Sequence, residues 1–118
     1  MNVKVRVTEV FRARFKRLQR KFPSLASDLL ALEKKLQENP QLGISLGHGA
    51  YKVRLAIKSK GRGKSGGARV ITYVEKETYE DETEGFIIIV NLITLYDKSE
   101  VATITDQELK AFIKDIQQ

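Results

Sequence analysis

The stretch YKVRLAIKSKGRGKSGGARVITYV, residues 51–74, contains two segments in which apolar and polar residues alternate, joined by a turn rich in glycine, lysine and arginine. Successive side chains of a β-strand point to opposite faces of the sheet, so residues 51–57 and 68–74 each predict a strand. The apolar face of the first strand would carry Tyr51, Val53, Leu55 and Ile57. Residues 60–67 are then the connection between the two strands.

The sequence before this stretch predicts one strand followed by two helices. Residues 3–7 alternate valine with cationic side chains, as a short half-buried strand does. Thr8 can cap a first helix, Pro23 interrupts it, and Ser24 can begin a second helix that ends at Asn39. The apolar stripes of the two helices are Phe11, Phe15, Leu18 and Phe22, then Leu25, Leu29, Leu32 and Leu36. Two helices separated by so short a break predict a helical hairpin.

The remaining segments predict a loop, an acidic turn, a strand and a helix. Residues 41–49 read as a glycine-punctuated loop, and residues 75–85 as a solvated acidic turn. Residues 86–96 are almost all apolar, which predicts a central strand covered on both faces. Thr105 and Glu108 have the spacing of a capping box at the start of a short helix.

The predicted order of elements is β-α-α-β-β-β-α, within a single domain covering residues 1–118. This order indicates an α+β fold, with a small antiparallel or mixed sheet, an N-terminal helical hairpin on one face and a short C-terminal helix. Lys52, Arg54 and Lys58 would point away from the helical hairpin and line the open face of the sheet.

The distribution of charge indicates a polyanionic partner. The formal net charge is +6. Residues 4–21 hold eight Lys or Arg and one acid, residues 39–74 hold seven and no acid, and residues 75–84 hold six acids. Such segregation creates a local positive field, and nucleic acid is the expected partner. A basic face that serves only solubility is the alternative.

Two nucleotide-binding patterns are incomplete. Gly61, Gly63 and Gly66 match G-x-G-x-x-G, but a strand follows them where the phosphate site needs a helix. A P-loop would place its first glycine at Lys58. The sequence therefore predicts no nucleotide cofactor.

Metal and thiol chemistry also lack the required residues. The chain has no cysteine and one histidine, His48, which is expected to be an ordinary loop residue. A zinc site would need His48 with carboxylates alone, and the acids are concentrated in one turn. No metal is predicted. No apolar run is long enough to span a bilayer and no secretory signal is visible, so no membrane partner and a cytoplasmic location are expected.

The chemistry that remains is that of lysine, arginine and tyrosine. Fixed cations can stabilise the charge that develops when a ribose 2′-hydroxyl attacks the adjacent phosphate, so RNA can be cleaved without metal. Lys52, Arg54, Arg69 and Tyr73 lie on neighbouring predicted strands and are candidates for such a site. Their alternative role is to bind phosphates without cleavage, with Tyr73 in the core.

The chain resembles the RelE/HigB group of bacterial type II toxins. The likeness rests on residues 51–74, on the long apolar strand followed by LYDKSE, and on the helix patterns F-x-x-x-F-K-x-L and P-x-L-x-x-D-L. It covers nearly the whole chain. The resemblance implies a toxin that cleaves mRNA on the ribosome without metal, to inhibit translation, and that a cognate antitoxin protein silences.

The resemblance also implies roles for particular residues. Lys52 and Arg54 would surround the scissile phosphate, Arg69 would contact it, and Lys98 would supply the basic residue that follows the last strand. The catalytic tyrosine near the C-terminus of RelE is missing, since the corresponding EVATIT contains no tyrosine. Tyr73, Tyr96 or Lys64 could take its place. The turn would form a cationic rim that attracts RNA through Lys58, Lys60, Arg62 and Lys64.

Two other functions fit the same fold. A ParE-like protein would inhibit DNA gyrase, although such a protein has no need of a phosphate-binding cleft. A non-catalytic module would bind RNA or the ribosome and leave the RNA intact, with an affinity that depends steeply on salt.

Overall fold

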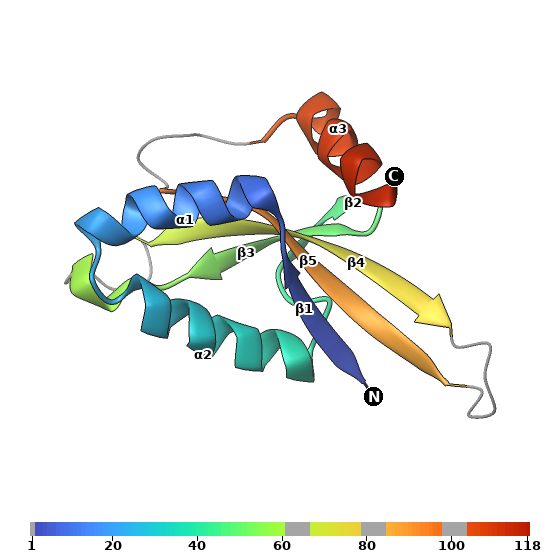
Figure 1. Ribbon diagram of the computed structural model, residues 1–118, viewed down its shortest axis with the longest axis horizontal. Helices are drawn as coiled ribbons and strands as arrows, with labels where there is room; N and C mark the ends of the chain where they lie inside the picture. The colour runs from blue at the N-terminus through green and yellow to red at the C-terminus, as the bar shows by residue number, and fades with distance from the viewer. Residues whose placement is uncertain (1, 61–66, 79–84, 98–103) are drawn as a thin grey trace.

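The computed structural model of the protein describes residues 2–60, 67–78, 85–97 and 104–118 (Figure 1). The elements are, in order, β1 Val3–Val7, α1 Glu9–Lys21, α2 Leu25–Glu38, β2 Ile44–Gly47, β3 Ala50–Leu55, the 3₁₀ turn η1 Lys58–Lys60, β4 Ala68–Thr78, β5 Phe86–Asp97 and α3 Asp106–Gln117. The predicted α+β class is confirmed.

The strands form one mixed sheet in the order β1-β5-β4-β3-β2. β1 pairs with β5 in parallel, and the other neighbours are antiparallel. β5 therefore lies inside the sheet, and its residues from Ile89 to Asp97 are buried. The central strand predicted from the run of apolar residues 86–96 is confirmed, because β5 lies between β1 and β4 and its side chains join apolar clusters on both faces of the sheet.

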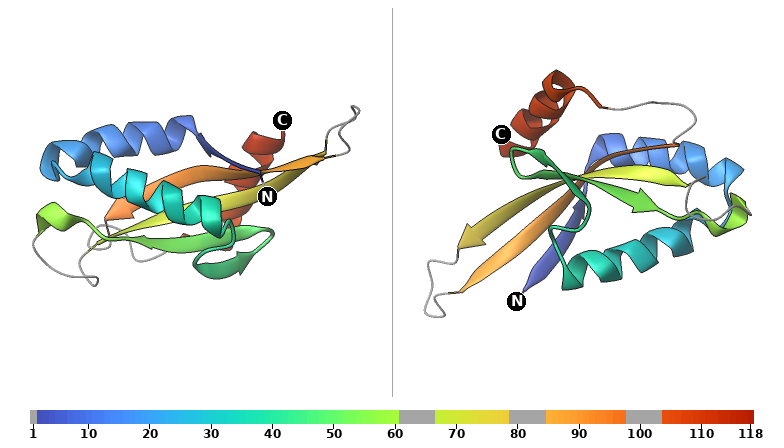
Figure 2. Two further views of the ribbon diagram at one scale, coloured as in Figure 1. Left: turned by 90° about the horizontal axis from the view of Figure 1, so that it is seen from below. Right: turned by 180° about the vertical axis from the view of Figure 1, so that it is seen from behind.

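The helical hairpin covers one face of the sheet, as predicted (Figure 2). The largest buried side chains of its two helices include Phe11, Leu25 and Leu36, each at most 1% exposed. They share one cluster with Val53 and Leu55 of β3 and with apolar residues of β4 and β5. The apolar stripes predicted from the sequence are thus the faces of α1 and α2 that pack on the sheet.

α3 covers part of the opposite face. Its Leu109 and Ile113 join a second cluster with Ile71 of β4 and Ile93 of β5. The capping box predicted at its start is present: the Glu108 N–H donates to Thr105 Oγ1, and the Thr105 N–H donates to the Glu108 carboxylate. The sheet is therefore covered by the hairpin on one face and by this single helix on part of the other.

Three predicted boundaries are wrong. Residues 41–49 are not all loop, because Ile44–Gly47 forms β2 and pairs with the start of β3. The acidic turn does not begin at residue 75, since β4 continues to Thr78 opposite Phe86. The ladder hydrogen bonds to β5 extend the strand there, while Glu77 and Thr78 remain exposed to solvent. β3 ends at Leu55, so Lys58 belongs to the η1 turn and not to the strand.

Thr8 joins the first helix to the central strand. Its Oγ1 accepts a hydrogen bond from the Phe11 N–H at 3.2 Å, which caps α1. The same hydroxyl lies 2.9 Å from the Leu92 carbonyl oxygen and 2.8 Å from that of Ile93, and donates to this pair of acceptors. A helix cap is thus combined with a tertiary contact between residues more than eighty positions apart in the sequence.

We predict that Thr8→Ala lowers the free energy of unfolding by about 2 kcal/mol, because it removes a helix cap and a bond to β5 together. Thr105→Ala is the matched control, since it removes a cap whose side-chain hydrogen bonds all stay within α3, and should cost about 1 kcal/mol. Urea unfolding of both variants measures the difference. Equal losses would show that the contact with β5 contributes nothing.

Candidate functional site

Three neighbouring strands bring two arginines and a tyrosine together on the sheet face opposite the helical hairpin. Arg54 of β3 lies opposite Arg69 of β4, and Arg69 lies opposite Tyr96 of β5. The adjacent rung is made of Val53, Val70 and Leu95, all in the cluster beneath α1 and α2. Because side chains alternate along each strand, Arg54, Arg69 and Tyr96 point to the other face.

Lys52 lies on the same face as Arg54, two residues back along β3. This spacing corresponds to about 7 Å along the strand. The Lys52 side chain is half-buried, and its rung continues through Ile71 and Thr94. We call Lys52, Arg54, Arg69 and Tyr96 the arginine cluster. The sequence prediction that Lys52 and Arg54 line the open face of the sheet is confirmed, and Arg69 of β4 lies on the same face.

The backbone brings the two arginines especially close. The Leu55 carbonyl oxygen points toward Gly67 on the β4 side, whereas the Lys52 carbonyl oxygen points toward Gly43 on the β2 side. Successive residues of a strand direct their N–H and C=O groups to opposite sides within the plane of the sheet. Arg54 comes two residues after Lys52 and one before Leu55, so its N–H and C=O point toward the β2 side and away from β4. The Arg54–Arg69 pair is then of the non-hydrogen-bonded kind, in which opposite Cα atoms are only about 4.5 Å apart.

Like charges directly opposite one another destabilise a sheet, and burial of one of them adds to the cost. Arg69 is only 8% exposed, and one of its terminal nitrogens donates to the Ala68 carbonyl oxygen at 3.1 Å. Within the described part of the chain, neither Arg54 nor Arg69 forms an ion pair with a carboxylate. An anion bound between the two guanidinium groups would offset both costs, and a phosphate suits their planar donors.

Tyr96 supplies a neutral donor beside this charge. It is 5% exposed, and its hydroxyl has no hydrogen-bond partner among the described residues. Burial raises the pKa of Tyr96, and the positive charge of Arg69 opposes this increase only in part. The phenol therefore stays protonated at neutral pH, where it can donate a hydrogen bond or a proton but cannot act as a base.

Tyr73, predicted as a catalytic residue, shares this face but lies away from the arginines. Its rung contains Ala50 and Asn91, and its ring packs in the α3 cluster. The Gln117 side-chain amide donates to its hydroxyl at 3.0 Å. Of the two strand tyrosines that the sequence left open, Tyr96 is the one beside Arg69.

The other predicted cations do not all surround the cluster. Lys58 is exposed in η1, and its backbone N–H donates to the Asp28 carboxylate at 3.2 Å. Lys60 does not have the rim position expected for it. Its Nζ lies 2.8 Å from the Asp97 carboxylate in a largely buried ion pair, and 5.1 Å from the centre of the Phe22 ring. Arg62, Lys64 and Lys98 lie outside the described residues.

His48 occupies the turn between β2 and β3, with a positive φ of 57° between two glycines. Its Nε2 lies 3.5 Å from the Asp106 carboxylate at the start of α3. It is absent from the arginine cluster, in agreement with its reading as an ordinary loop residue. Among the residues that the structure describes, no three His, Asp or Glu side chains are grouped so that they could hold a metal ion.

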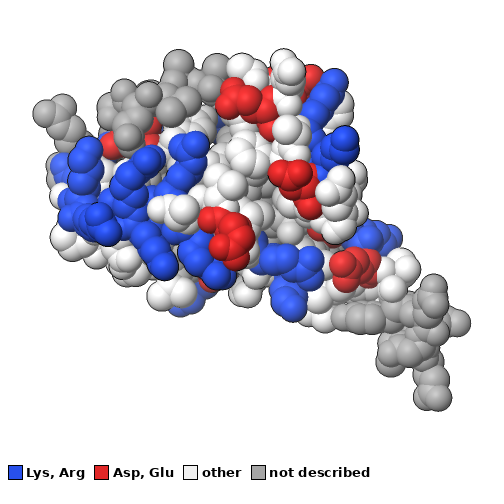
Figure 3. Space-filling view, turned by 45° about the horizontal axis from the view of Figure 1, so that its top comes forward, with Lys and Arg blue, Asp and Glu red and all other residues white. Residues whose placement is uncertain are grey.

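A second basic surface lies on α1, on the hairpin side of the molecule. Five exposed cations occupy this helix against one exposed acid, Glu9, and Figure 3 shows a dense group of Lys and Arg side chains toward one end of the molecule. The exposed cations are Arg12, Lys16, Arg17, Arg20 and Lys21. This surface can attract a polyanion, but it belongs to the face opposite the arginine cluster.

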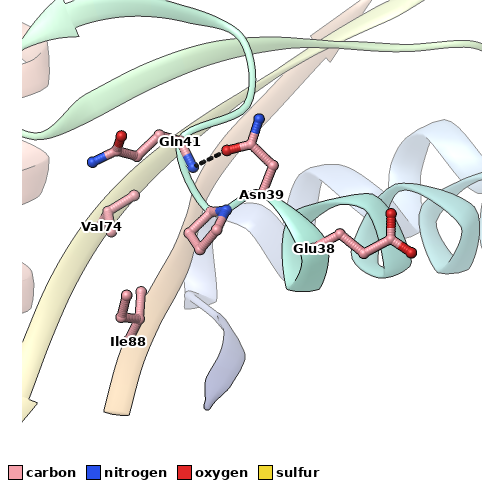
Figure 4. A pocket seen from close by; sticks show the side chains of 6 residues that line it. Glu38, Asn39, Gln41, Val74 and Ile88 are labelled. Carbon is pink, nitrogen blue, oxygen red and sulfur yellow. Dashed lines mark hydrogen bonds between the residues drawn. The ribbon is translucent and has the colours of Figure 1, made fainter. Parts of the chain in front are cut away.

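One cavity of about 300 Å³ lies where the end of α2 meets β4 and β5 (Figure 4). Its described lining is Glu38, Asn39, Pro40, Gln41, Val74 and Ile88. None of these is a cation, and the cavity is formed by the turn in which the Gln41 N–H donates to the Asn39 side chain at 3.2 Å. It offers no chemistry related to the arginine cluster. No helix in the described part of the chain is long and apolar enough to cross a membrane.

Comparison of the chain with models of known protein families gave no match. A search of curated proteins gave no match either.

Because burial favours the neutral phenol, we predict that Tyr96 keeps its proton above pH 10, the region in which an ordinary tyrosine titrates. The unfolded chain loses this proton near pH 10 while the folded protein retains it, so stability is unaffected below that pH and falls above it. Titration of tyrosinate absorbance should show a late phase that Tyr96→Phe lacks. If the phase that Tyr96→Phe lacks lies at or below pH 10, the raised pKa of Tyr96 is contradicted.

We also predict that sulfate, as a probe anion, raises the melting temperature by about 4 °C more than sodium chloride at equal ionic strength. The reason is that bound sulfate would neutralise the positive charges of the Arg54 and Arg69 guanidinium groups. Arg54→Gln should lose most of this increase, whereas Lys34→Gln, an exposed position on α2, should retain it. Equal responses of the two variants would show that the anion binds elsewhere.

Proposed function

We propose that this protein is a metal-independent endoribonuclease, a toxin of the RelE/HigB kind that cleaves mRNA on the ribosome and so inhibits translation. The observation that carries the proposal is the Arg54–Arg69–Tyr96 rung, with Lys52 beside it, on a sheet face that the helical hairpin leaves uncovered. A cognate antitoxin protein and a cytoplasmic location, where ribosomes work, are parts of the same proposal.

The reaction would proceed through the RNA's own 2′-hydroxyl. Its oxygen attacks the adjacent phosphorus, the bond to the 5′-oxygen of the next nucleotide breaks, and the products are a 2′,3′-cyclic phosphate and a 5′-hydroxyl. The 2′-hydroxyl loses its proton to water, and the leaving 5′-oxygen gains a proton from the protein, which water then restores, so that the protons balance. No redox change or metal enters this balance, so the protein has to stabilise charge and deliver a proton.

The arginine cluster supports both tasks. Arg54 and Arg69 would hold the non-bridging oxygens, whose negative charge grows in the phosphorane-like transition state. Lys52 adds positive charge on the same face. Tyr96, protonated at neutral pH and without a hydrogen-bond partner among the described residues, would donate toward the reacting phosphate. The close, like-charged pair costs folding stability, which a bound phosphate would restore.

The basic surface of α1 supports recognition of the ribosome or of RNA away from the reacting phosphate. Its charges are exposed and would act mainly through long-range attraction, which weakens as salt increases. Binding by this surface alone would leave RNA intact. A variant that loses cleavage but still binds the ribosome would therefore be affected in the arginine cluster and not in the basic surface of α1.

To test the proposal, Arg54→Gln and Arg69→Lys are compared with wild type on ribosome-bound mRNA in the presence of EDTA, with cleavage sites mapped by primer extension. Arg69→Lys keeps the buried charge but removes the planar pair of donors. We expect each variant to lose at least about 100-fold in cleavage rate, as is typical when one transition-state donor is removed.

Lys34→Gln is the matched control and should cleave as wild type does. Circular dichroism and the urea midpoint establish that each variant is folded before it is compared. If folded Arg69→Lys and Arg54→Gln cleave at the wild-type rate, or if the wild-type protein leaves ribosome-bound mRNA intact, the proposed function is wrong.

A further inference from the structure

Ile44, the first residue of β2, is the most exposed large apolar side chain in the part of the chain that the structure describes. It is 66% exposed, against 60% for Leu30 on α2 and 41% for Phe86 at the start of β5. Single exposed aliphatic side chains are common on soluble proteins. Ile44 differs from the others in its position, because its partner across the strand pair is Lys52 of the arginine cluster.

The side chain of Ile44 lies on the same face of the sheet as the arginine cluster. Residues directly opposite in an antiparallel pair share a face, so Ile44 points to the face of Lys52 and Arg54. Two residues further along β2, Leu46 packs in the cluster beneath α3, whereas Ile44 belongs to neither apolar cluster. Ile44 therefore lies where the cover provided by α3 ends and the open part of the sheet begins.

The backbone before Ile44 leaves it uncovered. Gly43 has a φ of +102°, and an added Cβ there would overlap the Lys52 carbonyl oxygen, so this position requires glycine. β2 begins at Ile44, and no strand in the described part of the chain lies beside Arg54 on this side. The pairing with Lys52 thus fixes Ile44 in place without covering its side chain.

The distance between Ile44 and the arginines suits a single nucleotide. Arg54 lies two residues beyond Lys52 on the neighbouring strand, so the Cα atoms of Ile44 and Arg54 are roughly 8 Å apart. This is comparable with the distance from a backbone phosphate to the far edge of its own base. Neither β2 nor β3 contains an acid that would repel the phosphate.

We propose that Ile44 contacts the nucleobase next to the phosphate held by Arg54 and Arg69, and so helps to determine which RNA the site accepts. The base has to be unpaired to reach this side chain, which favours single-stranded RNA. An aliphatic side chain has no hydrogen-bonding group with which to read the edge of a base. It discriminates by the apolar area that it covers, so a purine is preferred to a pyrimidine, and a pyrimidine to an abasic residue.

This inference rests on the proposed function for its biological role, but the contact can be measured without cleavage. The probes are 2′-O-methyl RNA trinucleotides, which lack the hydroxyl that attacks the phosphate and therefore bind without being cut. One carries three adenines, one carries three uracils, and one has an abasic residue at every position. The full chain is labelled with ¹³C at the isoleucine δ1 methyl groups, and Ile44→Val identifies the signal of Ile44.

We expect the adenine trinucleotide to shift the Ile44 methyl signal through the ring current of a base lying against it. The uracil trinucleotide should cause a smaller shift, and the abasic trinucleotide should cause none. A residue that serves only the fold would show no such dependence on the base.

Substitutions of Ile44 test the same contact by affinity. We expect Ile44→Ser to weaken binding of the adenine trinucleotide about fivefold, since apolar surface is no longer buried against the base, and to leave binding of the abasic trinucleotide unchanged. Ile44→Phe should bind the adenine trinucleotide more tightly, because bases stack well on aromatic rings. Leu30→Ser, the matched control on α2, should bind both as wild type does. Circular dichroism establishes that each variant is folded.

The inference is overturned by equal affinities of the wild-type protein for the adenine and abasic trinucleotides, by equal shifts of the Ile44 signal with both, or by equal effects of Ile44→Ser and Leu30→Ser. Self-association that Ile44→Ser abolishes would instead assign the exposed side chain to contact with a second copy of this chain.

Failure of this inference and failure of the proposed function give different results. If Arg54→Gln prevents binding of every trinucleotide and the base makes no difference, the phosphate site stands and the role of Ile44 is wrong. If the base-dependent shift of Ile44 is observed while ribosome-bound mRNA stays intact, the base contact is supported and the endoribonuclease activity is wrong.

Discussion

The register that joins β3, β4 and β5 is the constraint on which the candidate site depends. Arg54, Arg69 and Tyr96 are separated along the chain and meet only because each occupies the same rung. A shift of one residue in either pairing would turn one of these side chains into the helix-facing core. The apolar rung Val53–Val70–Leu95 next to it prevents such a shift, since its burial fixes which face is which.

A bulge in β5 completes this arrangement. The pairing passes from Ile71–Thr94 to Thr72–Leu92, which leaves Ile93 as an extra residue. Leu92 and Leu95 are three positions apart and would face opposite sides of a regular strand, yet both lie in the helix-facing cluster. Because of this extra residue, Leu92 and Leu95 can both face the helices while Tyr96 lies beside Arg69 on the other face. It also allows Ile93 to pack against α3 on the opposite face.

Stability and binding make opposite demands on the open part of the sheet. Two arginines in a close cross-strand pair, one of them buried, cost free energy in the isolated chain. A phosphate bound between the two guanidinium groups would offset this cost.

The sequence by itself determined the elements whose residues repeat with a clear period. The valines of residues 3–7, the apolar stripes of α1 and α2, the alternation of residues 51–55 and the capping box at Thr105 each need only local spacing to predict an element and its buried face. The common face of Lys52 and Arg54 followed from the same alternation, whereas the strand register placed Arg69 beside them.

Only the tertiary structure decided the rest. Because nearly every residue of β5 is apolar, no alternation shows which way Tyr96 points, and the bulge at Ile93 has no local signal. β2 forms because the start of β3 offers it a partner, and Lys60 pairs with Asp97 across 37 positions of sequence. Such choices depend on contacts between segments far apart in the chain, whose geometry is fixed only when the whole sheet has assembled.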